Sequence, residues 1–425
     1  MRVLVIGNGG REHALCIFIN KSPTCKKLFC IPGSDSIQEI ANCFKIDPMN
    51  NADIVDFCKE YKIDFVVVGP ELPLSNGIVD KLSEEKITVF GPDKASSQLE
   101  SSKIFMKNIC KNLNVPTAKY SFFDNEKKAL DFLDTVDFPT VIKADGLAAG
   151  KGVIIAKNKN EAVETIKNIM SKRIFGTSGE NIIIEEFLEG EEISFFALVD
   201  TNGFILPLTT AQDHKKIGEN DTGLNTGGMG AYSPAPVVTS EIHKKIMNQV
   251  IIPTIKGLDK EGISYCGFLY AGLMIDKEQN IKILEFNCRF GDPETQPILM
   301  RLNSDLIELC YKASKRKLQQ TELSWNSKVS LGVVMAAGGY PESYEKGNPI
   351  EGLPLETENI KVFHAGTMTE NNIIKTNGGR VLCVTALGED TTEAQLNAYN
   401  HVKQIKWKDC FYRKDIGYRA IKREA

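Results

Sequence analysis

The chain lacks several features that assign proteins to common classes. No apolar run reaches the roughly 18 residues that a membrane span needs, and the start shows no basic segment, short apolar stretch and small-residue cleavage site of an export signal. We therefore expect a cytoplasmic protein that makes no membrane contact. The 11 cysteines form an odd set without a CxxC pair, which favours reduced thiols over a disulfide framework.

An excess of positive charge is also absent. The net charge of −4 argues against nucleic-acid binding, because such binding usually requires a basic face, although local positive charge can still hold phosphates. The length of 425 residues, with 42% hydrophobic and 25% charged residues, is typical of a globular protein with two to four domains around a cleft.

The first hundred residues alternate short apolar runs with amphipathic segments, the runs being residues 3–6, 28–31, 65–68 and 88–90. This alternation predicts a doubly wound parallel sheet of the α/β class. Each run ends in turn residues. Ligands of such sheets bind at the carboxyl ends of the strands, so we expect substrate at these turns.

Later segments predict α+β units. A serine-rich junction near residue 100 precedes a helix that carries Lys103, and a unit that resembles a lid has strands at 140–144 and 152–155 around a glycine-rich loop. Strand patterns then lead to a helical stretch at 297–317, and Trp325 and Asn326 look like a linker before a smaller β-rich domain with strands at 329–336, 361–365 and 380–386. The predicted domains are 1–100, 101–120 with 191–325, 121–190 (the lid) and 326–425.

The loop GNGGREH at residues 7–13 connects a predicted strand to a predicted helix. Gly9 and Gly10 would let a phosphate approach amides that open the helix. Glu12 stands where the dinucleotide fingerprint requires glycine, which disfavours a dehydrogenase. We expect a sugar phosphate here, with a purely conformational tight turn as the alternative.

The segment KADGLAAGKGV at residues 143–153 is rich in small residues between two lysines. Lys143, Gly150, Lys151 and Gly152 could close over a triphosphate and offer amides and positive charge to its oxygens. The segment departs from the Walker pattern at Asp145 and Gly152. A mobile hairpin and a surface lysine pair without ligand are the alternative interpretations.

Residues 182–192 form an apolar run that ends in carboxylates. Such a strand can lie along a purine base while a later carboxylate meets ribose hydroxyls. An ordinary solvated strand end is the alternative interpretation.

The sequence ILEFNCRFGDPETQ at residues 283–296 carries the strongest pattern. Strand periodicity puts Glu285, Asn287 and Arg289 on one face, and Leu284, Phe286 and Cys288 on the other. Carboxylate and amide oxygens suit Mg²⁺ shared with nucleotide phosphates, and Arg289 could neutralise an acyl phosphate. An internal salt-bridge network is the competing interpretation, though burying one without a ligand is costly.

A charged turn at 212–216 precedes the glycine-rich segment 223–231. Together they can shape a small pocket in which Asp213 accepts an ammonium group. His214 is expected to be structural.

In order, these segments resemble the phosphoribosylamine-glycine ligase family of the ATP-grasp superfamily over nearly the whole chain. RFGDPETQ at 289–296 resembles the family's signature, supported by GNGGREH, VGPE, KADGLAAGKGV and NTGGMGAYSP. The resemblance implies a central ATP-grasp unit with its nucleotide under the lid. It implies ATP phosphates at Lys103 and Lys143, adenine along Glu185, Glu186, Phe187 and Leu188, ribose at Glu192, and Mg²⁺ or Mn²⁺ on Glu285 and Asn287.

The family's reaction joins glycine to 5-phosphoribosylamine through glycyl phosphate, with ATP converted to ADP, as the second step of purine synthesis. The resemblance implies catalytic roles for Lys143, Asp213 and Arg289. It implies that the substrates meet Gly9, Gly10, Pro70, Glu71, Asp213, Gly228, Met229, Arg289 and Asp292. A monomer with transient contact to the preceding amidotransferase is expected. The alternatives are another ATP-grasp carboxylate-amine ligase of purine synthesis and a nucleotide sensor without turnover.

Overall fold

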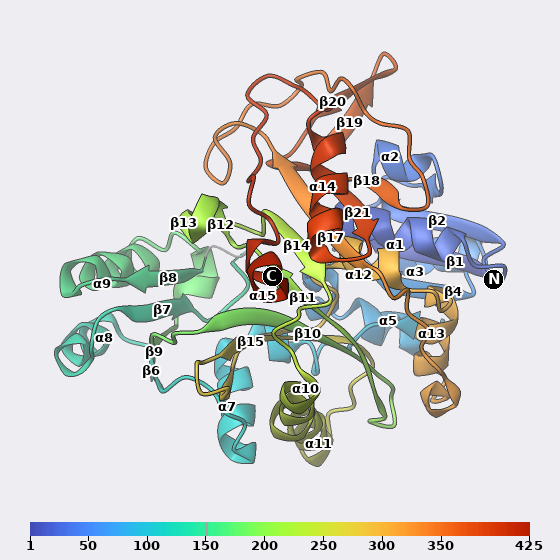
Figure 1. Ribbon diagram of the computed structural model, residues 1–425. Coiled ribbons are helices and arrows are strands. Elements are labelled where there is room, and N and C mark those ends of the chain that lie inside the picture. Colours follow the sequence, from blue (N-terminus) through green and yellow to red (C-terminus); the bar gives the residue numbers. More distant parts are fainter. Residues whose placement is uncertain (149–151) are drawn as a thin grey trace.

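The computed structural model describes residues 1–148 and 152–425. A long central sheet is flanked by an N-terminal unit on one side and by a lid that projects from the other, with the C-terminal segment above (Figure 1). Within the described ranges, no helix combines the length and the apolar character needed to cross a membrane.

The N-terminal unit is the doubly wound parallel sheet that the sequence predicts. Its strand order is β3-β2-β1-β4-β5, so the order reverses between β1 and β4 and brings the turns after these two strands to one edge. Its strands are β1 (Arg2–Gly7), β2 (Lys27–Pro32), β3 (Asn42–Cys43), β4 (Phe65–Val68) and β5 (Val89–Phe90). Its helices are α1 (Gly10–Asn20), α2 (Asp35–Gln38), α3 (Asn51–Glu60), α4 (Glu71–Ser75) and α5 (Ile78–Glu84).

Both faces of this sheet are covered, which explains why its strands are continuously apolar. Val3 and Val5 point into a core shared with the central region, while Leu4 and Ile6 point into a second core under α3 and α5. The N-terminal unit is therefore fixed against the centre of the molecule.

The lid is a four-stranded antiparallel sheet in the order β6-β9-β7-β8. Its elements are β6 (Tyr120–Phe123), α8 (Glu126–Phe132), a 3-10 turn (Leu133–Thr135), β7 (Thr140–Ala144), β8 (Val153–Ala156), α9 (Lys159–Ile166), a π turn (Lys167–Ser171), a second 3-10 turn (Gly176–Gly179) and β9 (Ile182–Glu186). Ile142, Ile166 and Ile184 belong to its own small core.

The central sheet has eight strands in the order β16-β15-β10-β11-β14-β17-β21-β18. They are β10 (Glu191–Val199), β11 (Ile205–Asp213), β14 (Gly230–Ser233), β15 (Gly267–Ile275), β16 (Ile281–Asn287), β17 (Val329–Ala336), β18 (Ile360–His364) and β21 (Arg380–Gly388). Two hairpins extend from it, β12 (Lys216–Gly218) with β13 (Thr222–Asn225) and β19 (Thr367–Glu370) with β20 (Ile373–Thr376).

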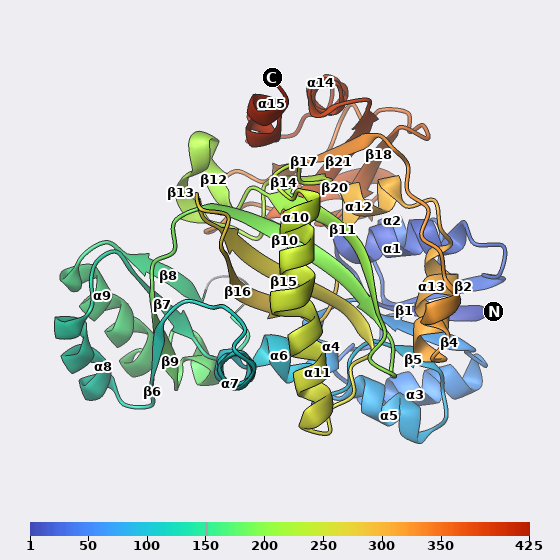
Figure 2. The same cartoon turned by 60° about the horizontal axis from the view of Figure 1, so that its bottom comes forward.

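Helices cover both faces of this sheet. Phe195 and Ala197 of β10 lie in the core that includes α7, α10 and α11, whereas Phe196 and Leu198 face the core shared with the N-terminal unit. Figure 2 shows α10 and α11 crossing the sheet as one long helical segment. The helices are α6 (Gln98–Ser101), α7 (Lys103–Leu113), α10 (Ser240–Ile246), α11 (Ile252–Lys260), α12 (Thr295–Arg301), α13 (Leu306–Ser314), α14 (Thr391–Val402) and α15 (Tyr418–Glu424).

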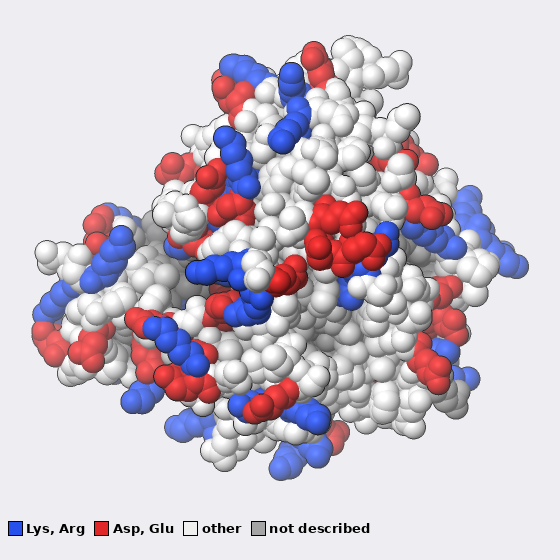
Figure 3. Space-filling view, viewed as in Figure 1, with Lys and Arg blue, Asp and Glu red and all other residues white. Residues whose placement is uncertain are grey.

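One of these elements differs from the sequence prediction. The helical stretch 297–317 is two helices, because Asp305 caps α13 by accepting hydrogen bonds from Ile307 N and Glu308 N at 3.0 and 3.1 Å. The C-terminal strands form the small β-rich unit that the sequence predicts, and the pairing of β14 with β17 joins them to the central sheet. The surface seen in Figure 3 carries acidic and basic side chains interspersed.

Candidate active site

The lid lies against strand β16 at the nucleotide side of the predicted site. Lys143 Nζ at the end of β7 donates to Leu284 O at 3.2 Å, and Lys103 Nζ donates to Gly146 O in the glycine-rich segment at 3.2 Å. The lysine-bearing lid and the polar strand edge therefore face one site.

Asp145 fastens the glycine-rich segment to the start of α7. Its Oδ1 atom accepts from Ile104 N at 2.9 Å and from Ser102 Oγ at 3.3 Å, while its backbone oxygen accepts from Lys103 N at 3.2 Å. An anion at a helix N-terminus is favourable, so this contact holds Lys103 near the lid.

Of the remaining predicted residues of this segment, Gly150 and Lys151 lie outside the described residues. Gly152 O accepts from Ala144 N at 2.9 Å, and a Cβ on Gly152 would lie 2.7 Å from Ala148 Cβ. Glycine is required there by the close packing of the segment on itself.

The acidic end of β9 is more heavily paired than the sequence suggests. The buried Glu185 carboxylate lies between Lys107 Nζ at 3.0 Å and Lys143 Nζ at 2.9 Å, so its side chain is directed at lysines. Glu186 accepts from Lys119 N at 2.9 Å and pairs with Lys282 at 2.6 Å.

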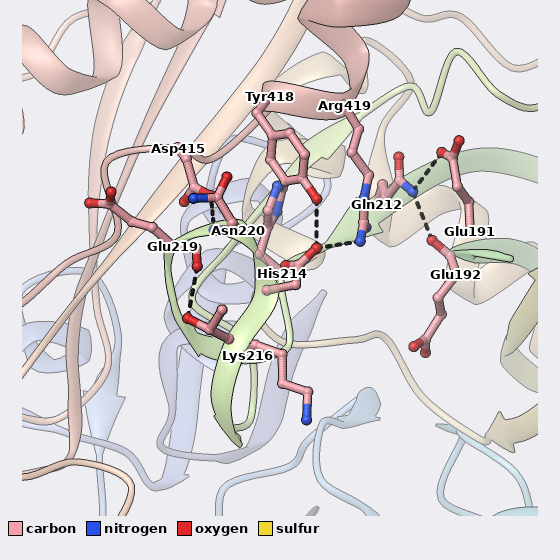
Figure 4. Close-up of polar contacts among 12 residues, drawn as sticks. Glu191, Glu192, Gln212, His214, Lys216, Glu219, Asn220, Asp415, Tyr418 and Arg419 are labelled. Carbon is pink, nitrogen blue, oxygen red and sulfur yellow. Dashed lines mark hydrogen bonds and ion pairs between the residues drawn. The ribbon is translucent and has the colours of Figure 1, made fainter. Parts of the chain in front are cut away.

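The chain after β9 leads to the ribose candidate. Phe187 is exposed and Leu188 is half-buried. Glu192, at the start of β10, pairs with Lys215, and its backbone oxygen accepts from Gln212 Nε2 at 3.0 Å (Figure 4).

A β-bulge shapes the polar edge of β16. Glu285 pairs with Gly272 and Ile283 with Leu273, so Leu284 is one extra residue between them. Phe286 shares a core with Ile283, and Leu284 does not belong to that core. The prediction that Leu284 packs beside Phe286 and Cys288 is therefore wrong, because the bulge shifts the side-chain alternation by one residue.

Glu285 and Asn287 lie on the same side of the strand after the bulge. Burial would raise the pKa of Glu285, but Lys215, Lys143 and Lys103 outweigh burial and lower it, so the carboxylate is ionised. Lys215 Nζ lies 3.6 Å from it. An ionised carboxylate beside an amide oxygen fits a hard cation. No cluster of three or more His, Cys, Asp or Glu side chains with metal-site geometry occurs among the described residues.

Arg289 links this strand to the N-terminal unit. Its guanidinium contacts Glu100 at 2.8 Å and Glu71 at 3.1 Å, and the carboxylates raise the pKa of Arg289 against the effect of burial. Glu71 is the first residue of α4, directly after Pro70, and it also lies 3.8 Å from Arg11. Part of the salt-bridge interpretation is thus realised, but with N-terminal partners.

Asp213 ends β11 in a tight pocket. Its Oδ1 atom is buried and has no hydrogen-bond partner among the described residues, and burial followed by the Glu294 charge raises the pKa of Asp213 well above its usual range. A Cβ on Gly228 would lie 2.6 Å from Asp213 Oδ1, so only glycine leaves this space open. Met229 is fully buried in the C-terminal core, and its amide and carbonyl pair with His214 and Val334, so it offers no free group to a ligand.

The hairpin after Asp213 is anchored by the C-terminal segment. His214 is structural, because Gly417 N donates to His214 Nε2 at 3.2 Å while the other ring nitrogen lies 3.0 Å from Gly230 O. Tyr418 OH donates to Asp221 at 2.7 Å and Arg419 pairs with the same carboxylate; both side chains point toward the hairpin in Figure 4. The C-terminal helix thereby fixes the loop that carries the candidate ammonium site.

A cavity of about 450 Å³ lies between the N-terminal loops and the C-terminal segment. Gly9, Gly10, Asp292 and Arg380 line it, and Arg380 Nη2 lies 3.2 Å from Asp292 Oδ2. Gly9 N donates to Glu12 Oε2 at 2.8 Å, so this amide is already paired, and a phosphate in the cavity would have to bind other groups.

Sequence reasoning missed three charged residues at this site. Lys107 lies one helical turn after Lys103, and that spacing was the available signal for a second lysine on the same face. Glu100 and Arg380 come from segments distant in sequence, so only the fold shows that they meet Arg289 and Asp292.

Comparison with family models covers most of the chain. Residues 1–100 match the N domain of phosphoribosylglycinamide synthetase, residues 101–295 match its ATP-grasp (A) domain, and residues 330–419 match its C domain. A phosphoribosylamine-glycine ligase of Vibrio vulnificus (strain CMCP6) is 52% identical over 427 residues, covering 100% of this chain and 99% of the relative. The Escherichia coli (strain K12) ligase is 51% identical over 428 residues and is covered completely, as is this chain.

Solved structures agree with these matches. The phosphoribosylamine-glycine ligase of Thermotoga maritima is 31% identical with a TM-score of 0.84, covering 98% of this chain and 100% of that chain. The biotin carboxylase domain of the Hydrogenobacter thermophilus 2-oxoglutarate carboxylase, a complex with ADP, magnesium and bicarbonate, is 17% identical with a TM-score of 0.76 over 97% of this chain and 91% of that chain, and this likeness concerns the fold alone. The chain belongs to the phosphoribosylamine-glycine ligase family.

Proposed function

We propose that this protein ligates glycine to 5-phospho-D-ribosylamine, forming glycinamide ribonucleotide, ADP and phosphate in the second step of purine synthesis. The observation that carries the proposal is the placement of two lysines at the edge of β16: Lys215 Nζ lies 3.6 Å from Glu285, and Lys143 Nζ donates to the adjoining Leu284 O. Such an arrangement supplies both a cation site and positive charge for a triphosphate. The relatives at 52% and 51% identity carry the name of this activity.

ATP would lie between the lid and β16, with its phosphates at Lys103 and Lys143. The chain from Glu185 to Leu188 would line the adenine with its backbone groups, and Glu192 would meet the ribose. Mg²⁺ or Mn²⁺ would be held by Glu285 and Asn287, where it would neutralise phosphate charge.

The proposed chemistry has two steps. A glycine carboxylate oxygen attacks the γ-phosphorus of ATP, and the bond to ADP breaks, which gives glycyl phosphate. The amine nitrogen of phosphoribosylamine then attacks the carbonyl carbon, the C–O bond to phosphate breaks, and the amine loses a proton. No protein nucleophile is needed, since positioning and charge neutralisation carry phosphoryl transfer.

Asp213 and Arg289 have complementary roles in this proposal. The buried Oδ1 of Asp213, which has no hydrogen-bond partner within residues 1–148 and 152–425, would accept the glycine ammonium, and the incoming positive charge would keep the carboxylate ionised. Arg289 would stabilise the acyl phosphate, which requires it to share its guanidinium between that group and the Glu71 and Glu100 carboxylates.

Phosphoribosylamine would occupy the cavity between the N-terminal loops and the C-terminal segment. Gly9, Gly10 and Asp292 line that cavity, and Arg380 adds positive charge to it. The turn at Pro70 and Glu71 would complete the site from the neighbouring strand.

The remaining proposals concern organisation. We propose domains at 1–100, 101–120 with 191–325, 121–190 and 326–425, and a cytoplasmic monomer that contacts the preceding amidotransferase transiently. Another carboxylate-amine ligase of purine synthesis is the alternative function.

Omission of one substrate at a time tests the function. ADP release should require both glycine and phosphoribosylamine, and mass spectrometry should detect glycinamide ribonucleotide only in the complete mixture. ADP release with formate or bicarbonate in place of glycine would support the alternative ligase, and ATP binding without any amide product would indicate a sensor.

A further inference from the structure

Lys107, Glu185 and Lys143 form a buried charged cluster where the lid joins the body, called here the lysine–glutamate–lysine cluster. Glu185 lies 3.0 Å from Lys107 Nζ and 2.9 Å from Lys143 Nζ. Lys107 comes from α7, whereas the other two come from lid strands β9 and β7; α7 lies beside these strands in Figures 1 and 2. The cluster therefore joins the lid to the body.

Lys107 has no direct access to a ligand. Its side chain is 0% exposed, and its Nζ atom donates to Thr117 Oγ1 at 2.7 Å. The Thr117 hydroxyl in turn donates to Ile283 O of β16 at 3.0 Å, so Thr117 can act only as an acceptor toward Lys107. The ammonium form of Lys107 is thus matched by one hydrogen-bond acceptor, Thr117, and by the ion pair with Glu185.

Lys143 differs from Lys107 in its surroundings. It also donates to Leu284 O, the carbonyl of the bulged residue, which places it beside Glu285. A single carboxylate shared by two lysines leaves a net charge of +1 in the cluster. If Lys107 were absent, Glu185 and Lys143 would cancel, and Lys143 would present little charge to a phosphate.

We propose that Lys107 is a positioning residue that neutralises Glu185 and so leaves the charge of Lys143 available to the nucleotide phosphates. The inference rests on the proposed nucleotide site, and it adds a residue that does not itself contact ATP. An alternative role for Lys107 is to support the packing of α7 only.

Nucleotide binding separates these roles, because charge acts on phosphates and packing acts on the whole nucleotide. Calorimetric titrations with ATP and with adenosine would compare wild type, Lys107→Met, Glu185→Gln and the double variant. Lys111→Met is the matched control, since Lys111 is an exposed lysine of the same helix. Circular dichroism would verify the fold of each variant.

We expect Lys107→Met to weaken ATP binding by about tenfold or more, because Glu185 loses the positive charge that lies in direct contact with it. Adenosine binding should stay unchanged, because adenosine carries no phosphate. The double variant restores the net charge of +1 and should recover affinity to within about threefold of wild type; Glu185→Gln should bind ATP at least as tightly as wild type. The last two variants also carry the test if Lys107→Met does not fold.

Equal ATP affinity in wild type and Lys107→Met would overturn the inference, as would no recovery in the folded double variant. An equal loss of ATP and adenosine binding would indicate the packing role. If wild type itself failed to bind ATP, the proposed function would fall together with the inference.

Discussion

Replacement of Arg289 by methionine should lower the free energy of unfolding as well as abolish ligation. The Arg289 guanidinium lies 2.8 Å from the Glu100 carboxylate, whose side chain is 7% exposed. Without the guanidinium, the Cys288 amide, which donates to Glu100 at 2.7 Å, is the hydrogen-bond donor that remains. Removing one partner of a buried ion pair costs about 3–5 kcal/mol. Glu71 is 27% exposed and keeps Arg11 at 3.8 Å as a partner. We therefore expect the free energy of unfolding to fall by the lower end of this range, about 3 kcal/mol.

The loss should depend on pH through Glu71 and through Glu100, whose pKa burial raises to about 7. Burial alone would raise the pKa of Glu71, but Arg289 and then Arg11 outweigh it and hold the pKa at about 2, below the usual 4.5. Because the folded-state pKa is depressed, this carboxylate stabilises the protein above about pH 4.5 and the contribution is lost as the pH falls toward 2. That difference corresponds to about 3 kcal/mol, part of which Arg289 supplies.

Urea unfolding at about pH 7.5 and pH 4, followed by circular dichroism, measures both effects. Arg289→Met should unfold at lower urea than wild type, and the gap between the two proteins should be smaller at pH 4, because burial raises the pKa of Glu100 to about 7 and this carboxyl is protonated at pH 4 and needs no cationic partner. Adding Glu100→Gln should recover part of the loss, because the buried charge is removed, and Arg316→Met at an exposed position is the control. A wild-type urea midpoint for Arg289→Met at the higher pH would refute the reasoning.

Two further substitutions test the proposed ligand contacts. Glu285→Gln should raise the Mg²⁺ concentration for half-maximal turnover by about tenfold or more, because a charged oxygen ligand becomes neutral. A metal titration measures this, with Glu278→Gln in the exposed turn before β16 as the control. An unchanged titration curve for Glu285→Gln would count against the metal role. Asp213→Asn should raise the KM for glycine by about tenfold or more with little effect on the KM for ATP, since only an ammonium ligand needs the negative charge. Steady-state kinetics measures both constants. Equal changes in the two KM values would contradict the assignment of Asp213 to glycine.

Local patterns predict much of this fold because they report burial directly. The strands at 140–144 and 329–336 coincide with β7 and β17, since each is a short run of mostly apolar residues in the interior. The pairing of β14 with β17 could not be predicted, because it joins segments about a hundred residues apart. The hydrophobic pattern of each segment does not indicate which strand it pairs with.

The candidate site was predictable where one segment carries it. Glu285 and Asn287 lie two residues apart on one strand, but the bulge at Leu284 that frees a carbonyl for Lys143 depends on pairing with β15. The two partners of Arg289 likewise come from segments far from it in the sequence. Glu71 belongs to α4 and Glu100 belongs to α6. Such contacts are set by domain packing, which a single sequence does not display.

Oxygen transfer from glycine to phosphate tests the proposed chemistry most directly. With glycine labelled by ¹⁸O in its carboxylate, attack on the γ-phosphorus followed by displacement leaves one labelled oxygen in each inorganic phosphate formed. Mass spectrometry of the phosphate should find one ¹⁸O per product molecule in the complete mixture. Phosphate without the label, formed together with glycinamide ribonucleotide, would contradict the glycyl phosphate route.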